Sequence, residues 1–130
     1  MILTVQTDQK RQIVDITEQI EKQLSGVGLA HIFVRHTTAA LTTADLDPGT
    51  DLDVLDALEA MTPQKQWRHP HDPEHFPDHL WASLIGPDVS IAYQEGKLQL
   101  GSWQRVILVE LDGPREREIA ITLVTDSGDR

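Results

Sequence analysis

The 130-residue chain contains no cysteine. This excludes a disulfide framework, a thiolate nucleophile and a zinc or iron–sulfur site with Cys ligands, so any metal must use His, Asp or Glu. The sequence also lacks the run of about 20 apolar residues that a membrane-spanning helix requires, and no basic segment followed by an apolar run opens it. We therefore expect a cytoplasmic protein that makes no contact with a membrane.

Positive charge is scarce, because 11 Lys and Arg residues stand against 21 Asp and Glu residues and give a formal net charge of -10. The acidic residues are spread along the chain and no basic stripe is present, which argues against a nucleic-acid partner. A pocket that gathers a few Arg and His residues can still bind an anionic small molecule. The chain has no GxGxxG, P-loop, HExxH or Gly-x-Ser-x-Gly motif, which excludes the commonest nucleotide, metalloprotease and hydrolase sites. No organic cofactor is expected.

The hydropathy pattern predicts one α+β domain over residues 1–130. Strands are predicted at residues 2–7, 12–16, 29–35, 37–43, 89–93, 97–100, 103–111 and 116–125. Helices are predicted at residues 18–25 after a Thr17 cap, from near Thr50 until Pro63, and at residues 78–85. The first two strands are expected to form a hairpin, and the short connections favour antiparallel sheets.

The six histidines are the clearest chemical signal, and four of them lie between His69 and His79. Imidazole binds divalent metals and titrates near neutral pH, so such a cluster suits either metal binding or acid–base catalysis. Three of them could form a zinc site with one open position. We expect His71 and His75 to be exposed loop residues, whereas His79 is either a half-buried histidine of an amphipathic helix or a site residue.

His36 ends a predicted strand and is followed by Thr37 and Thr38, whose hydroxyl and backbone N–H groups could hold an oxyanion. The alternative is a strand-end histidine that is hydrogen-bonded to the backbone. Alternation does not decide which face Glu110 occupies. If it is buried, it needs a cation such as Arg115 or a metal, because an unpaired buried carboxylate is strongly destabilising.

Five motifs in order resemble the YjbQ-like family, which is described as secondary thiamine-phosphate synthase enzymes. They are His36-Thr-Thr-Ala39, Trp67-Arg-His69, His79-Leu-Trp-Ala-Ser-Leu-Ile-Gly86, Leu100-Gly-Ser-Trp-Gln104 and Glu110-Leu-Asp-Gly-Pro-Arg115 with Arg117. The resemblance implies a β-sandwich-like α+β fold with about three helices, a homotrimer, and a pocket that takes a small phosphorylated molecule and a divalent metal, either zinc or magnesium.

The resemblance also implies roles for individual residues. The implied catalytic residues are His36, His79 and Glu110. The implied substrate-binding residues are Thr37, Thr38, Trp103, Gln104, Arg115 and Arg117, and the implied metal ligands are His36, His69 and His79. The sequence departs from the family pattern at Ala44 and Asp45, where an Asn-Glu pair is usual, and at His75, where Asn is usual.

Three functions follow as alternatives. The first is a transferase of the thiamine-phosphate synthase type, in which Arg115 or Arg117 and a metal would neutralise the leaving diphosphate. The second is a metal-dependent hydrolase or transferase with another substrate. The third is a non-catalytic trimeric module that binds a ligand.

Overall fold

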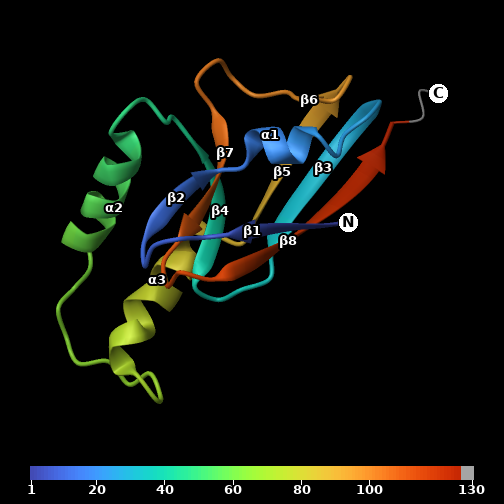
Figure 1. The fold of residues 1–130 in the computed structure, drawn as a ribbon. Helices are drawn as coiled ribbons and strands as arrows, with labels where there is room; N and C mark the ends of the chain where they lie inside the picture. The colour runs from blue at the N-terminus through green and yellow to red at the C-terminus, as the bar shows by residue number, and fades with distance from the viewer. Residues whose placement is uncertain (127–130) are drawn as a thin grey trace.

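In the computed structural model, which describes residues 1–126, the strands form two antiparallel sheets (Figure 1). The first sheet has the order β1-β8-β3-β5-β6 and the second the order β2-β7-β4. The strands are β1 (Ile2–Gln6), β2 (Gln12–Asp15), β3 (Val27–Val34), β4 (Ala39–Ala44), β5 (Asp88–Gln94), β6 (Lys97–Leu98), β7 (Arg105–Glu110) and β8 (Glu116–Thr125). The predicted α+β class with antiparallel pairing is confirmed.

The alternation of residues in β3 shows how the two sheets pack. Ala30, Ile32 and Val34 are fully buried and point toward the second sheet, where they join one core cluster with Leu41 of β4 and Leu108 of β7. Side chains at the intervening positions of β3 point to the other face of the first sheet. That outer face carries exposed apolar side chains.

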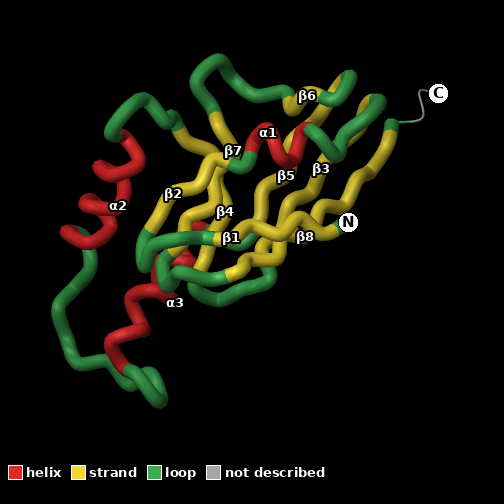
Figure 2. Tube along the Cα trace, viewed as in Figure 1, coloured by secondary structure: helices red, strands yellow, loops and turns green. Residues whose placement is uncertain are grey.

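Three helices complete the fold of the described residues: α1 (Thr17–Glu21), α2 (Thr50–Ala60) and α3 (Phe76–Ile85), which follows a short 3₁₀ turn, η1 (Pro73–His75). α1 adds Ile20 to the core between the sheets. Figure 2 shows α2 and α3 on the side of the second sheet that faces away from the first. There Leu58 of α2 and Trp81 of α3 form a second core with Ile107 and Val109 of β7. No helix among residues 1–126 is both long and apolar enough to cross a bilayer.

The predicted hairpin of the first two strands is wrong. β1 pairs with β8 in the first sheet, whereas β2 pairs with β7 in the second. Residues 7–11 and residues 111–115 are therefore two corners at which the chain passes from one sheet to the other. The corners contact each other, because the N–H of Gly113 donates to the carbonyl of Lys10 at 2.9 Å. A Cβ at Gly113 would lie 2.2 Å from the carbonyl oxygen of Gln9, so this contact requires glycine.

The predicted helix at residues 18–25 ends at Glu21, and its cap is also wrong. The hydroxyl of Thr17 accepts the N–H of Val106 at 2.8 Å, so it fixes the helix to β7 rather than capping it. The helices after Thr50 and around residues 78–85 lie where the sequence predicts them, with Pro77 in the first turn of α3 and Gly86 at its end. The hairpin of β5 and β6 is confirmed.

Candidate functional site

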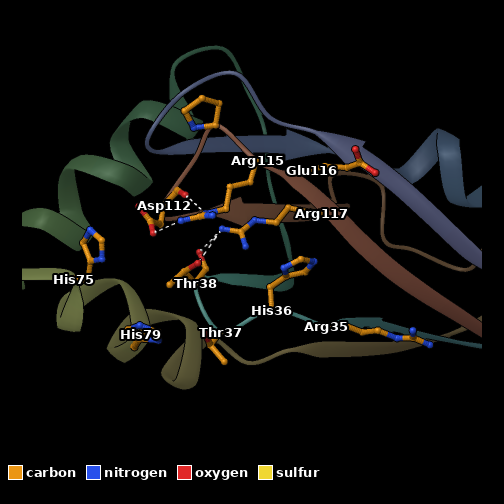
Figure 3. A pocket seen from close by; sticks show the side chains of 11 residues that line it. Arg35, His36, Thr37, Thr38, His75, His79, Asp112, Arg115, Glu116 and Arg117 are labelled. Carbon is orange, nitrogen blue, oxygen red and sulfur yellow. Dashed lines mark hydrogen bonds and ion pairs between the residues drawn. The ribbon is translucent and has the colours of Figure 1, made fainter. Parts of the chain in front are cut away.

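A cavity of about 730 Å³ lies between the second corner, residues 111–115, the loop that joins β3 to β4, the start of β8 and the start of α3 (Figure 3). The loop before β4 contributes His36, Thr37 and Thr38, and the corner before β8 contributes Arg115. The remaining lining residues are Arg35, His75, His79, Asp112, Pro114, Glu116 and Arg117. Segments far apart in the sequence therefore form one polar cavity, and it includes most of the residues that the resemblance implies.

Arg117 of β8 lines one wall of the cavity, and a buried ion pair with Glu110 of β7 supports it from behind. The exposed fraction is 1% for Arg117 and 0% for Glu110. Nε of Arg117 donates to the two carboxylate oxygens at 2.9 and 3.1 Å, and Nη2 also donates to the carboxylate. The sequence suggests a cation such as Arg115, or a metal, as the partner of a buried Glu110. The partner in the structure is Arg117, because Arg115 lies in the corner and pairs with Asp112.

The Glu110 carboxylate stays ionised in this wall. Burial raises its pKa, but hydrogen bonds from Arg117, from the Thr7 hydroxyl at 2.6 Å and from the Asp112 N–H at 3.2 Å outweigh burial and lower the pKa below its ordinary value. With its oxygens occupied by these donors, Glu110 has no geometry for proton transfer to a ligand. Its contacts make it a positioning residue for Arg117.

Several hydrogen-bond donors at the cavity have no acceptor among residues 1–126. Nη2 of Arg117 donates to the carbonyl and hydroxyl oxygens of Thr38, at 3.1 and 3.0 Å, which leaves Nη1 without a partner in this part of the chain. The backbone N–H groups of His36, Thr37 and Thr38 also make no hydrogen bond within the described residues. In Figure 3 the guanidinium of Arg117 lies between the side chains of Thr38 and His36. The residues that carry these donors line the same cavity, which suits an oxyanion.

His36 is held in one orientation by the backbone of β8. Its Nε2 accepts the N–H of Glu118 at 3.0 Å, so a neutral ring carries its proton on Nδ1. Burial, followed by the positive charge of Arg117, lowers the pKa of His36 below 6.5 and favours this neutral form. The ring can therefore donate a hydrogen bond from Nδ1. A metal on Nδ1 would require a proton on Nε2, which would oppose the N–H of Glu118.

The start of α3 is tied to both corners by charged residues. Asp78 is 1% exposed, and its two carboxylate oxygens bind Lys10 and Arg11, each at 2.8 Å. Lys10 also binds Asp112 at 2.7 Å, and Asp112 binds Arg115 at 3.1 Å. These contacts position His79, the residue after Asp78, at the cavity.

The predicted three-histidine metal site is not assembled. The rings of His69 and His79 are in contact, with centroids 4.5 Å apart, but His36 is bonded to Glu118 on another wall. Among residues 1–126, no group of three or more His, Asp or Glu side chains is arranged to hold a metal ion. The residues therefore do not fit the zinc or magnesium ion that the resemblance implies.

Three other residues lie elsewhere than the sequence suggests. Trp103, which is 73% exposed, and Gln104 precede β7, whereas Glu110 ends it, so they lie at the far end of that strand from the cavity. They do not line the cavity of their own chain. His75 does line it, although the sequence suggests an uninvolved loop residue. Asp78 is not predicted from the sequence, because no nearby residue indicates its partners, which lie 67 and 68 residues away.

Comparisons with known proteins agree with the resemblance. A family model described as UPF0047 protein YjbQ-like matches residues 1–126. A UPF0047 protein from Archaeoglobus fulgidus is 37% identical over 123 residues, which cover 93% of this chain and 98% of that protein. The UPF0047 protein YugU from Bacillus subtilis is 29% identical over 127 residues, which cover 94% of this chain and 96% of YugU. The crystal structure of the conserved hypothetical protein TT1486 from Thermus thermophilus has a TM-score of 0.87 at 36% identity, covering 95% of this chain and 99% of that one.

Proposed function

The chain belongs to the YjbQ-like UPF0047 family, and from this premise we propose that its cavity binds the phosphate group of a small phosphorylated molecule. The observation that carries the proposal is the set of unused donors at Arg117, Thr37 and Thr38. A phosphate presents several acceptor oxygens and matches planar guanidinium and backbone N–H donors well.

The electrostatics of the cavity support an anionic ligand. The whole chain carries a formal charge of -10, yet this one cavity is lined by three arginines, Arg35, Arg115 and Arg117, against two acids, Asp112 and Glu116. Arg115 is half-exposed, and its bonds to Asp112 use Nε and Nη2. Its Nη1 has no acceptor in the described chain, so it is available to a ligand. A local positive region inside an acidic protein attracts small anions while the rest of the surface repels polyanions.

The test is calorimetric titration of the protein with inorganic phosphate. Arg115→Met removes one cation from the cavity and should weaken binding about tenfold, equivalent to about 1.4 kcal/mol. Arg105→Met is the matched control, because Arg105 also pairs with an aspartate, Asp15 at 2.7 Å, but lies at the other end of β7. It should change the affinity less than twofold. No phosphate binding by the unmodified protein, or equal losses in the two variants, would contradict the proposal.

For the reaction, we propose a transferase of the thiamine-phosphate synthase type. The nitrogen of a thiazole phosphate bonds to the methylene carbon of a pyrimidine-methyl diphosphate, the C–O bond breaks, and pyrophosphate leaves with the electron pair. Arg115 and Arg117 supply positive charge to the leaving group, and His36 donates a hydrogen bond from Nδ1. Because no metal site is assembled among residues 1–126, no step is assigned to a metal.

An assay with both substrates, with and without magnesium, tests this reaction. We expect turnover by the unmodified protein and loss of turnover when His36→Ala and His79→Ala are combined. If the unmodified protein turns over no faster than this double variant, the transferase is rejected. Phosphate binding is tested separately by calorimetry.

We also propose that the chain assembles as a homotrimer through the outer face of the first sheet. Leu29 and Phe33 of β3 are exposed there beside Val124 of β8 and Ile2 of β1. Exposed apolar side chains gathered on one sheet face in this way favour burial against another copy. Sedimentation should give a trimer, and Leu29→Arg should give a monomer. Leu52→Arg, at an exposed position on α2, should remain trimeric. A monomeric unmodified protein would contradict the assembly.

A further inference from the structure

Asp78 is a buried carboxylate that the proposed ligand does not touch. It lies in the first turn of α3, immediately before His79, and holds both Lys10 and Arg11 of the first corner. An ion pair on the protein surface contributes little, whereas removal of one partner from a buried pair leaves an uncompensated charge. Because Asp78 is 1% exposed, its two cations compensate a buried charge at the start of α3.

The two cations of Asp78 differ in what else they contact. Arg11 has no ion pair except that with Asp78 among residues 1–126. Lys10 lies between Asp78 and Asp112, at 2.8 and 2.7 Å, and the second carboxylate oxygen of Asp112 binds Arg115 at 3.1 Å. A continuous chain of ion pairs therefore leads from α3 to a cation of the cavity, and Arg11 lies outside it.

We propose that Lys10 is a positioning residue for the anion site: by bridging Asp78 and Asp112 it couples α3 to Arg115 and keeps Arg115 available to the ligand. This inference rests on the proposed phosphate binding. Lys10 shares the negative charge of Asp112 with Arg115. Without Lys10, Asp112 is compensated by Arg115 alone, and the cavity presents less positive charge to an anion.

The ionisation of the bridge is consistent with this role. Burial lowers the pKa of Lys10, but its bonds to Asp112 and Asp78 outweigh burial and raise it. Burial raises the pKa of Asp112, but bonds from Lys10 and Arg115 outweigh it and lower the pKa. The cluster contains three cations, Lys10, Arg11 and Arg115, and two carboxylates, which leaves one positive charge beside the cavity.

The experiment compares Lys10→Met with Arg11→Met in titrations with inorganic phosphate. Each variant loses one positive charge and one ion pair to Asp78, and Lys10→Met also loses the pair with Asp112, so a role through Asp78 alone predicts equal effects on phosphate affinity. We expect the melting temperatures to fall by similar amounts. Phosphate affinity should fall five- to tenfold in Lys10→Met and less than twofold in Arg11→Met. Lys10→Arg, which keeps the charge, should bind phosphate within twofold of the unmodified protein.

A double variant tests whether Lys10 acts through Asp112. Asp112→Asn removes the charge that Lys10 and Arg115 share, so Lys10→Met should cause no further loss of affinity in that background. Equal affinities of Lys10→Met and Arg11→Met, or additive losses with Asp112→Asn, would overturn the inference while the phosphate site stands. If the unmodified protein fails to bind phosphate, the proposed function fails first and the role of Lys10 fails with it.

Discussion

Replacement of Glu110 by Gln removes the negative charge that compensates Arg117 while keeping the shape of the side chain. Arg117 then remains 1% exposed, with the carbonyl and hydroxyl of Thr38 as its remaining oxygen partners besides the new amide. Removal of one partner from a buried ion pair typically destabilises a protein by about 3–5 kcal/mol. Because Gln still accepts one hydrogen bond and Nη1 of Arg117 faces the cavity, we expect the lower limit, about 3 kcal/mol.

This loss of stability is measurable by thermal and urea unfolding. An unfolding entropy of about 2.1 cal/mol/K per residue gives about 0.27 kcal/mol/K for a chain of this length, so the melting temperature should fall by about 11 °C. Glu116→Gln, at an exposed position one residue before Arg117, is the control and should change stability by less than about 0.5 kcal/mol. Adding Arg117→Met to Glu110→Gln should restore part of the loss. If Glu110→Gln is within about 1 kcal/mol of the control, the pair is not the stabilising wall described above.

Three further substitutions give independent tests. His36→Gln keeps an acceptor for the backbone N–H but cannot titrate. Because the pKa of His36 is lowered in the fold, the unfolded state takes up a proton first as pH falls through 6.5. Urea titrations should therefore show that the unmodified protein loses stability below pH 6.5 relative to the variant. A difference in unfolding free energy between the two proteins that does not change with pH would contradict this. Gly28→Ala places a Cβ 2.3 Å from the carbonyl oxygen of Val124. Calorimetry should show that the free energy of unfolding falls by about 1–3 kcal/mol. An unchanged stability would refute the close approach. Trp81→Phe removes the 2.8 Å hydrogen bond from Nε1 to the Thr62 hydroxyl. Chemical unfolding should show that the free energy of unfolding falls by about 1 kcal/mol. An unchanged free energy would contradict the role of this bond.

Elements with local signals are predictable from this sequence. The alternation of apolar residues defines β3 and its buried face, and Pro77 with Gly86 bounds α3. These signals depend on residues within one or two turns of each other. They do not specify which strands pair, so two strands close in sequence suggest a hairpin although the chain changes sheet between them.

The candidate site is predictable only in part for the same reason. The His36-Thr37-Thr38 loop is predicted as an oxyanion site because its donors are adjacent in the sequence, and the structure places all three residues at the cavity. The partner of Glu110 is not predictable, since Arg115 and Arg117 both lie shortly after it along the chain and only the path of the corner decides that Arg117 faces it. Trp103 belongs to a family motif but lies before the start of β7, at the opposite end of that strand from the cavity. The motif alone does not reveal this distance.

The position of the cavity beside the second corner has a consequence for how this protein can evolve. Thr38, Glu110 and Arg117 connect the two sheets, and Thr38 and Arg117 also line the cavity, so a change in any of them should affect the fold and the proposed ligand site together. Arg35 and Thr37 are exposed and make no side-chain hydrogen bond or ion pair within the described chain. New specificity within the family should therefore arise first at these two rim positions, while the wall changes only through coordinated substitutions.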